Sequence, residues 1–432
     1  MSNKPAKLQP LDLSKWRNVP TMMIGVGAVL ALIGLGVSFG VLHDGGKQFA
    51  YSWLLAFMFC LSIGLGALFL VLAHHLFDAG WSVPIRRFCE HIASLLPIMF
   101  VLWIPIGIFA PKLYQWFSEI QNHTAAHDEA LLAKAPLFTI PGFYIVSLGI
   151  FAVWFVLTRG LRSWSIKQDT MGGSLPTYKM RSYSYWGIFM FAATLTGAAI
   201  MWMKGLQHQW FSTMYGVCYF AGSVWMTLAL VYLITMVLSR QGILTDVLHE
   251  HQFYFIGSLL FAFTVFYAYV TFAQYFIIWN GNIPEETFYY IIREKGTWFW
   301  ISMIIIFGHF FIPFLGLLRI DVKSVFPYMT GLGCFIWLMH YFDMAFQIYP
   351  VAYKDGYPWQ FIWLDFGCIA LMVGILAKVF LARFAASAPY PLKDPRLIEA
   401  MGHYHPVPTQ LSGGELDETD DLHGAPNHGK SH

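Results

Sequence analysis

The sequence has 432 residues, of which 57% are hydrophobic and 12% are charged, about half the charged share of an ordinary soluble protein. A water-soluble globule of this length could not bury that much apolar surface, whereas a lipid bilayer accommodates it. The formal net charge of +2 gives no basis for binding nucleic acid or an acidic substrate.

Ten apolar runs along the chain are each long enough to cross a bilayer, which takes roughly 20 residues of helix. Tryptophan and tyrosine crowd the ends of several runs, as in the aromatic belts of membrane proteins. We therefore predict an all-α polytopic membrane protein with about ten transmembrane helices. The predicted spans are residues 20–42, 50–73, 87–110, 140–158, 184–203, 211–238, 253–279, 298–318, 325–349 and 359–383.

The segments between the spans predict the sidedness of the chain. Of the 26 lysines and arginines, 19 lie on the side of the two termini and 7 lie on the other side. Because positive residues accumulate on the cytoplasmic side, both termini are predicted to be cytoplasmic. We expect a cytoplasmic segment at 1–19, a membrane domain at 20–388 and a cytoplasmic tail at 389–432, disordered after residue 410.

Cysteines and glycines are interpreted as packing residues. The five cysteines show no CxxC or CxxCH spacing, so we expect the chain itself to hold no iron–sulfur cluster, c-type haem or other metal. No catalytic residue is assigned. Pairs of glycines suit close contact between helices, namely Gly36 with Gly40, Gly64 with Gly66, and Gly331 with Gly333.

Ionisable residues are costly inside a bilayer, on the order of 3 kcal/mol each, so those present need partners or a function. Near the predicted cytoplasmic face, the stretch HHLFDAGWSVPIRRFCEH holds His74, Asp78, Glu90 and His91. Glu90 follows Arg86 by four residues, so the two can pair on one helix face. The cluster is either a proton entrance built from titratable side chains or a set of basic residues neutralised by Glu90.

Three further predicted spans carry titratable residues at greater depth. His309 lies near the centre of the eighth span, four residues before Pro313, which tends to free a backbone carbonyl there. His340 and Asp343 share a helix face in the ninth span, and Asp365 lies in the outer part of the tenth. With the inner cluster these residues form a ladder across the membrane, interpreted as a candidate proton path. The alternative is a set of buried polar contacts that fix helix packing.

Three motifs give the chain a resemblance to a known family. They are TFAQYFIIWNGNIPEETFYYIIREKGTWFW (Thr271 to Trp300), HHLFDAGWSVPIRRFCEH (His74 to His91) and KDPRLIEAMGHYH (Lys393 to His405). Through them the chain, over roughly residues 15–405, resembles the NrfD/polysulfide-reductase-like membrane subunits of alternative complex III, in particular the shorter of the two paralogues. The stretch GNIPEETFYY is the most specific part, and GWSVPIRR is shared more widely with NrfD-like proteins.

The resemblance implies a function in the bacterial inner membrane. Such complexes oxidise menaquinol and pass the electrons to a periplasmic cytochrome c or directly to an oxidase. Menaquinone, haem c and iron–sulfur clusters would belong to the complex, whereas this chain would bind none of them and would contact lipids. Its partners would be a paralogous NrfD-like membrane subunit, a periplasmic iron–sulfur subunit, multihaem and monohaem cytochromes c, and small membrane subunits.

The resemblance also carries expectations for this chain. Its fold would contain two four-helix bundles with flanking helices, and its role would be structural and proton-conducting. Glu285 and Glu286 lie in a loop on the outer side, so we expect them to contact the periplasmic subunits.

Three other functions stay open at this stage. The chain could bind quinone within the same complex, or it could be a stand-alone secondary transporter or a b-haem anchor. Transporters favour helices broken at the midplane and inverted repeats, whereas most predicted spans here are uninterrupted. A b-haem anchor needs paired histidines at matching depth, and His309 has no second midplane histidine to pair with.

Overall fold

The computed structural model describes residues 16–122, 128–135, 137–244 and 247–401. These residues form helices joined by turns, and none of them forms a β-strand, which confirms the predicted all-α class. The first fifteen residues of the predicted N-terminal segment lie outside the described residues. So does the tail beyond Met401, including the part that we expect to be disordered.

Within the described ranges, ten long helical segments, here called crossings, correspond to the ten predicted spans. The third crossing is divided at Ser94 and Leu95, and the eighth contains a π turn. The crossings are α1 (Asn18–Gly40), α2 (Lys47–Leu76), α3 (Val83–Ala93) with α4 (Leu96–Ile108), α8 (Ile140–Met171), α9 (Leu175–Ala198) with the π turn η3 (Ala199–Met203), α10 (Tyr215–Arg240), α11 (Glu250–Gly281), α13 (Gly296–Ile305) with the π turn η5 (Ile306–Phe311) and α14 (Ile312–Leu318), α15 (Phe326–Ile348), and α16 (Ile362–Ala385).

Nine crossings in the described part of the chain are long and apolar enough to span a membrane. Helix α15 is not among them, although it has 23 residues, because His340, Asp343 and Gln347 lower its hydropathy. None of these three side chains is exposed on the surface that would face lipid. Helix α15 therefore carries several polar groups of the protein interior, and the fold is that of an all-α polytopic membrane protein.

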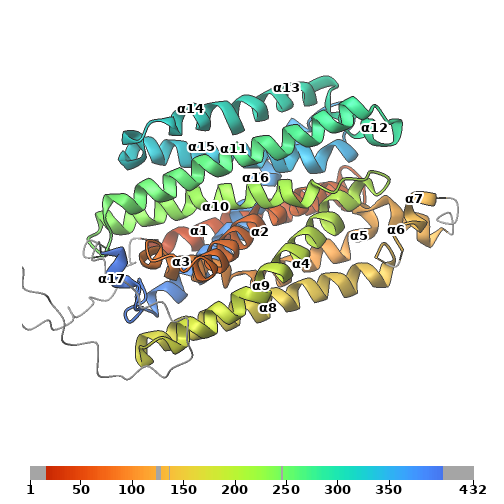
Figure 1. The fold of residues 1–432 in the computed structure, drawn as a ribbon. Helices are drawn as coiled ribbons and strands as arrows, with labels where there is room; N and C mark the ends of the chain where they lie inside the picture. Colours follow the sequence, from red (N-terminus) through yellow and green to blue (C-terminus); the bar gives the residue numbers. More distant parts are fainter. Residues whose placement is uncertain (1–15, 123–127, 136, 245–246, 402–432) are drawn as a thin grey trace, which may run out of the picture.

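The crossings form two groups of four with a flanking pair. The first group contains α2, α3 with α4, α8 and α9, and the second contains α10, α11, α13 with α14, and α15. Helices α2 and α10 pack along each other where the groups meet, and α1 packs on α16. Figure 1 shows α8 and α9 along one side of the molecule and α13 and α14 along the opposite side.

Both described chain ends lie at one end of the bundle, here called the terminal end, together with α3 and the short helix α17 (Leu397–Ala400) (Figure 1). The other end, here called the opposite end, is capped by short helices. These are α5 (Ala110–Leu113), α6 (Gln115–Gln121), α7 (Glu129–Leu132) and α12 (Pro284–Arg293). The two predicted outer loops, 111–139 and 280–297, therefore contain helix and lie at the same end.

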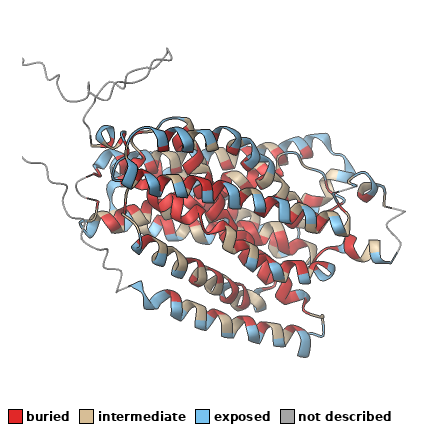
Figure 2. Cartoon of the chain, turned by 90° about the horizontal axis from the view of Figure 1, so that it is seen from below, coloured by how far each residue is buried: buried red, intermediate tan, exposed pale blue. Residues whose placement is uncertain are grey.

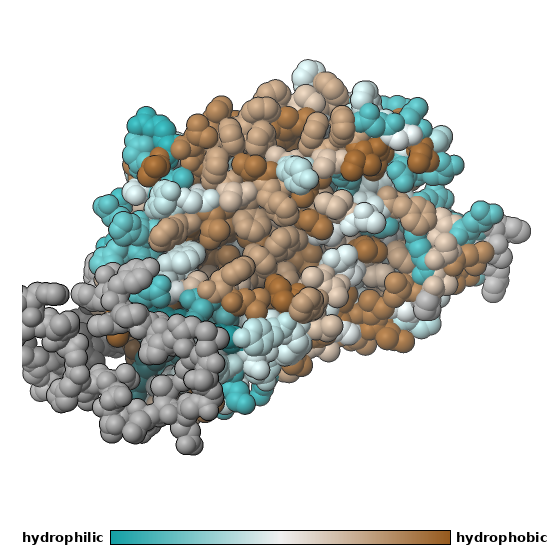
Figure 3. Space-filling view, viewed as in Figure 1, coloured by the Kyte–Doolittle hydropathy of each residue, from teal (hydrophilic) through white to brown (hydrophobic). Residues whose placement is uncertain are grey.

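Apolar side chains cover the flanks of the bundle, and the titratable side chains of the predicted ladder that belong to the crossings lie inside it. Figure 3 shows hydrophobic residues over the middle of the visible face and hydrophilic residues toward its two ends. Figure 2 shows buried residues concentrated along the centre of the bundle. Glu90, His309, Asp343 and Asp365 are each at most 3% exposed. The titratable residues of the predicted ladder that lie within the crossings thus face the protein interior.

Candidate functional site

His309 lies inside the π turn η5 and is 1% exposed. A π turn inserts an extra residue into a helix and often marks a functional position. Pro313 follows in α14, as expected of a helix in which a proline disturbs the preceding turn. The imidazole stacks between two rings, with centroids 3.7 Å from Trp225 and 3.8 Å from Tyr267. Among the described residues, neither ring nitrogen has a hydrogen-bond partner of ordinary geometry.

The tautomer of His340 follows from its neighbours. Its Nε2 atom lies 3.0 Å from the Ser62 hydroxyl, and that hydroxyl donates to the carbonyl oxygen of Phe59 at 2.7 Å. Because the Ser62 proton is already used, Nε2 of His340 is the donor, and Nδ1 carries a lone pair. Nδ1 is buried and has no hydrogen-bond partner among the described residues. A buried acceptor without a partner is unfavourable, which indicates a position prepared for a proton or another ligand.

Asp343 completes a compact group with the two histidines. The Tyr267 hydroxyl lies beside the Asp343 carboxylate, and Nε2 of Gln347 lies 3.5 Å from its Oδ1 atom. One nitrogen from each histidine and one carboxylate oxygen all lie within 4.8 Å of one another. We call His309, His340 and Asp343 the histidine–aspartate centre. Its imidazole and carboxylate groups are those that exchange protons near neutral pH, and they are also groups that can hold a divalent transition-metal ion.

Gln347 connects this centre to the opposite end of the bundle. Its Oε1 atom accepts a hydrogen bond of 2.7 Å from the Tyr289 hydroxyl in α12. The buried Arg293 donates to the carbonyl oxygen of Gln347 at 3.2 Å and to Oε1 of Gln207 at 3.1 Å. Gln207 is only half-buried, so polar contacts run from Asp343 to the surface at the opposite end.

Asp365 lies in a separate polar cluster. Its carboxylate accepts hydrogen bonds from Tyr341 at 2.8 Å, from Tyr357 at 3.4 Å, and from Tyr349. The Tyr349 hydroxyl also contacts Ser52 Oγ at 3.1 Å. Among the described residues, Asp365 makes no direct hydrogen bond to any member of the histidine–aspartate centre. The structure therefore does not bring Asp365 together with the histidine–aspartate centre.

The predicted inner cluster is a network of ion pairs at the terminal end. Nε of Arg86 lies 2.9 Å from Glu90 Oε1, which is the expected pairing four residues apart, and Arg87 Nη2 lies 2.8 Å from Asp169 Oδ1. Arg86 also pairs with Asp394. In total the network holds four arginines and four carboxylates, namely Arg86, Arg87, Arg181 and Arg396 with Asp78, Glu90, Asp169 and Asp394.

The chain end after α16 supplies two members of this network. Asp394 and Arg396 are 4% and 6% exposed, although they belong to the segment predicted as a polar tail. Burial by itself would raise the pKa of Asp394, but Arg86 and Arg396 outweigh it and hold that pKa below its usual range. The motif KDPRLIEAMGHYH therefore contributes buried ion pairs, a role that its polar composition does not predict.

The remaining inner candidates occupy different environments. Asp78 is exposed and adopts a left-handed backbone conformation with φ 52°, and it pairs with Arg181 at 2.6 Å. Nε2 of the buried His91 lies 2.8 Å from Ser387 Oγ. His74 is buried, and its Nδ1 atom lies 2.5 Å from Ser82 Oγ. These residues lie near one another at the terminal end.

An apolar layer separates the inner cluster from the histidine–aspartate centre. Helix α2 touches the centre through Ser62 and the inner cluster through His74, and these positions are about 18 Å apart along a straight helix. Leu65, Leu68 and Leu72 lie buried between them. Hydrogen bonds of the described residues link the centre to the opposite end and not to the terminal end.

Two acidic positions predicted as partner contacts lie in the first turn of α12. Glu285 is exposed and Glu286 is half-buried. A second group of possible cation ligands, Glu119, Asp128 and His208, lies at the same end. His208 Nε2 contacts Asp128 Oδ2 at 2.6 Å, so this group is already held together by its own hydrogen bond.

Comparisons with known proteins leave the chain without an assigned relative. No family model matches it, and no curated protein matches it either. The resemblance to the NrfD-like subunits therefore rests on the three sequence motifs, and the geometry of the histidine–aspartate centre stands independently of any relative.

Proposed function

We propose that this chain is an integral membrane subunit of a menaquinol-oxidising complex of the alternative complex III type, with a structural role and a role in proton conduction. The observation that carries the proton role is the histidine–aspartate centre, a buried pair of histidines with a carboxylate inside the bundle. Relay groups of this kind are typical of proton pathways through membranes. Lipid-facing positions would not hold them, because unpaired ionisable groups are costly there.

Each residue of the centre has a definite task in this proposal. Nδ1 of His340 offers the buried lone pair that accepts a proton, and Asp343 offers the negative charge that stabilises the resulting cation. Trp225 and Tyr267 present the faces of their rings to His309, and ring faces attract a positively charged imidazole. Gln347, which accepts a hydrogen bond from Tyr289, contacts Asp343 on the side from which the proton leaves.

The orientation of the chain follows from its charges. The terminal end would face the cytoplasm, since 19 of the 26 lysines and arginines belong to that side. The opposite end, with Glu285 and Glu286, would face the periplasm and contact the iron–sulfur and cytochrome c subunits. The ion-pair network at the terminal end has equal numbers of opposite charges, which suits a structural part better than an open proton entrance.

One test concerns the complex. The chain, purified from its native membrane under mild detergent, should carry with it a multihaem cytochrome c and an iron–sulfur subunit, visible as haem absorbance. A chain that purifies colourless and alone under conditions that preserve other respiratory complexes would contradict the membership in a quinol-oxidising complex.

A second test concerns the proton role. Asp343→Asn should lower the number of protons released per quinol oxidised in inverted and right-side-out vesicles, because the amide cannot be ionised. Asp365→Asn is the matched control, a buried carboxylate in its own tyrosine cluster, and it should leave the ratio unchanged. If both variants assemble and release protons like the wild type, the centre has no part in conduction.

A further inference from the structure

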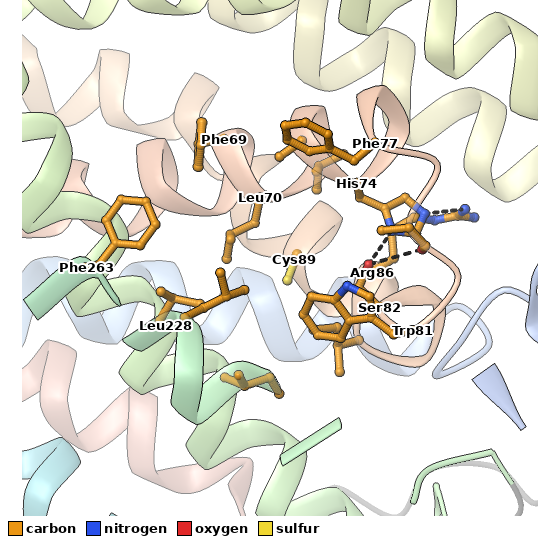
Figure 4. Close-up of a pocket in the computed structure, with 16 residues that line it drawn as sticks. Phe69, Leu70, His74, Phe77, Trp81, Ser82, Arg86, Cys89, Leu228 and Phe263 are labelled. Carbon is orange, nitrogen blue, oxygen red and sulfur yellow. Dashed lines mark hydrogen bonds between the residues drawn. The ribbon is translucent and has the colours of Figure 1, made fainter. Parts of the chain in front are cut away.

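A cavity of about 420 Å³ lies near the terminal end, beside the ion-pair network and apart from the histidine–aspartate centre. Helices α2, α10 and α11 form its walls with apolar side chains, among them Leu70, Leu228 and Phe263. Its polar end holds His74, Ser82 and Arg86. Figure 4 shows these three residues together on one side, with the rings of Phe77 and Trp81 beside them, and Leu70, Leu228 and Phe263 on the other. The volume is within the range of sites that bind small molecules.

The hydrogen bonds at the polar end fix the direction of each donor. Arg86 can only donate, and its Nη1 atom lies 3.5 Å from Nε2 of His74, so Nε2 accepts and Nδ1 of His74 carries the proton. Nδ1 then donates to Ser82 Oγ at 2.5 Å. The Ser82 hydroxyl keeps its own proton, whose acceptor within the protein is the carbonyl oxygen of Ala79 at 3.4 Å. A ligand oxygen at ordinary hydrogen-bond distance would be a better acceptor.

The charges around the cavity select the type of head group. The Arg86 guanidinium is already paired with Glu90 and Asp394, and the surrounding network is balanced between arginines and carboxylates. An anionic head group would disturb that balance and lose its own hydration. A neutral acceptor such as a carbonyl oxygen matches a single hydroxyl donor without adding charge.

The mouth of the cavity opens toward the flank of the bundle. Phe77 at its rim is exposed, and Leu70, Ala73 and Leu259 are half-buried. These side chains belong to the surface that apolar residues cover, so a ligand would enter from the lipid. An apolar chain of the ligand could lie in the cavity and continue into the bilayer.

We propose that this cavity binds an elongated apolar molecule whose end carries a neutral carbonyl oxygen, which accepts a hydrogen bond from Ser82. The ring of a membrane quinone and the ester group of a membrane lipid share this chemistry. The proposal depends on the cavity alone, and it stands whether or not the chain conducts protons or belongs to a respiratory complex.

Binding can be measured on the full chain in lipid nanodiscs. The probe is a methyl-naphthoquinone with a short isoprenoid tail, titrated while its quenching of tryptophan fluorescence is followed. Trp81 lines the cavity, so Trp81→Phe identifies the part of the quenching that comes from this site. Saturable quenching that Trp81→Phe removes is expected. If the probe does not bind, a diacylglycerol carrying a photoreactive acyl chain serves as the second probe, and crosslinks to α2 and α11 would assign the cavity to a lipid ester.

Two variants test separately the hydrogen bond from Ser82 and the free volume of the cavity. Ser82→Ala should weaken binding about fivefold, the usual effect of losing one hydrogen bond. Ala73→Phe should abolish binding by filling the cavity. Ala193→Phe is the matched control, because Ala193 is exposed on α9, away from the cavity, and it should bind like the wild type. Binding that survives both Ser82→Ala and Ala73→Phe, or saturable binding of neither probe, would overturn the proposal.

Discussion

The imidazole of His309 lies face to face with the indole of Trp225, at a centroid separation of 3.7 Å and an angle of 19°. Tyr267 covers the other face at 3.8 Å. Ring faces carry negative partial charge, so this arrangement favours the positively charged imidazole over the neutral one. The stacking therefore partly offsets the cost of placing a cation inside the bundle, and it gives the aromatic residues a part in the proposed proton path.

Replacing Trp225 tests this relationship. Trp225→Leu should slow proton movement through the chain about tenfold, since a cation–ring contact in a desolvated site contributes roughly 1–2 kcal/mol. The rate can be followed with a pH-sensitive dye trapped in proteoliposomes under a potassium diffusion potential. Trp225 also donates to Thr264 Oγ1 at 2.8 Å, so Thr264→Val controls for the loss of that hydrogen bond. Equal rates in Trp225→Leu and the wild type would remove the stacking from the mechanism.

The crossings and the inward orientation of their titratable residues could be predicted from the sequence. Apolar runs of sufficient length are distinct signals, and all ten predicted spans correspond to helical crossings. Charged and histidine residues inside such runs are costly in lipid, so their burial was expected. Glu90, His309, Asp343 and Asp365 are indeed buried.

The partners of these residues could not be predicted in the same way. Trp225 and Ser62 belong to helices that are far from His309 and His340 in the sequence, and an aromatic or hydroxyl residue in a span has many possible neighbours. Asp394 and Arg396 were expected in a polar tail, since composition alone does not show that a charged segment folds back onto other charges.

The glycine pairs also show that a pattern in the sequence does not predict which neighbour a residue contacts. Gly64, Gly66 and Gly333 do meet neighbouring helices closely, as predicted. The prediction was wrong for Gly36, Gly40 and Gly331, because a Cβ atom at any of these positions would meet nothing within 4 Å. Spacing identifies a shared helix face, but it does not tell whether that face meets a helix or lipid.

Removing Asp394 should destabilise the terminal end. Among the described carboxylates, Asp394→Ala leaves Arg396 with only the exposed Asp78 and leaves Arg86 with Glu90 alone, which should lower the free energy of unfolding by about 3 kcal/mol in detergent micelles. Asp321→Ala removes one partner of an exposed ion pair with Arg319 and should change the unfolding curve little. Similar curves for the two variants would show that the buried network contributes no more than a surface pair.

The same carboxylate gives a prediction for acidic pH. The pKa of Asp394 is held below its usual range in the folded chain. Its contribution to the free energy of unfolding is therefore present at pH values above about 4, and it is lost as the pH falls toward the lower pKa of the folded chain. The wild type should therefore lose more stability than Asp394→Asn between about pH 5 and about pH 2. Parallel losses in the two proteins would contradict this assignment.

Lys134 gives a prediction at alkaline pH, where stability should again rise with pH, although here the buried cation is destabilising. Burial lowers the pKa of this lysine to about 8, although the nearby Asp128 opposes the shift. The unfolded chain, with an ordinary lysine pKa of about 10.4, binds more protons over this interval, so stability should rise with pH between about 8 and about 10. Lys134→Met removes the titrating group, and its melting temperature should rise less over that range than the wild type's. The comparison uses the slopes with pH, because the substitution also removes the contact of Lys134 with the Phe211 ring at 4.0 Å.

The contact between α1 and α16 depends on Gly27. A Cβ atom at this position would come within 2.4 Å of the backbone nitrogen of Leu371 and within 2.8 Å of the carbonyl oxygen of Gly367. Backbone atoms cannot turn away as a flexible side chain can, so Gly27→Val must push the two helices apart. We expect a loss of about 2–3 kcal/mol in the free energy of unfolding, typical of overpacking.

Gly25 provides the matched control on the same helix. A Cβ atom there would meet nothing within 4 Å, so Gly25→Val adds the same side chain without a clash and should leave the stability nearly unchanged. A cysteine pair across α1 and α16 would report the separation directly through its crosslinking rate. That rate should fall in Gly27→Val and not in Gly25→Val. Equal stability and equal crosslinking in both variants would mean that α1 does not pack on α16 through Gly27.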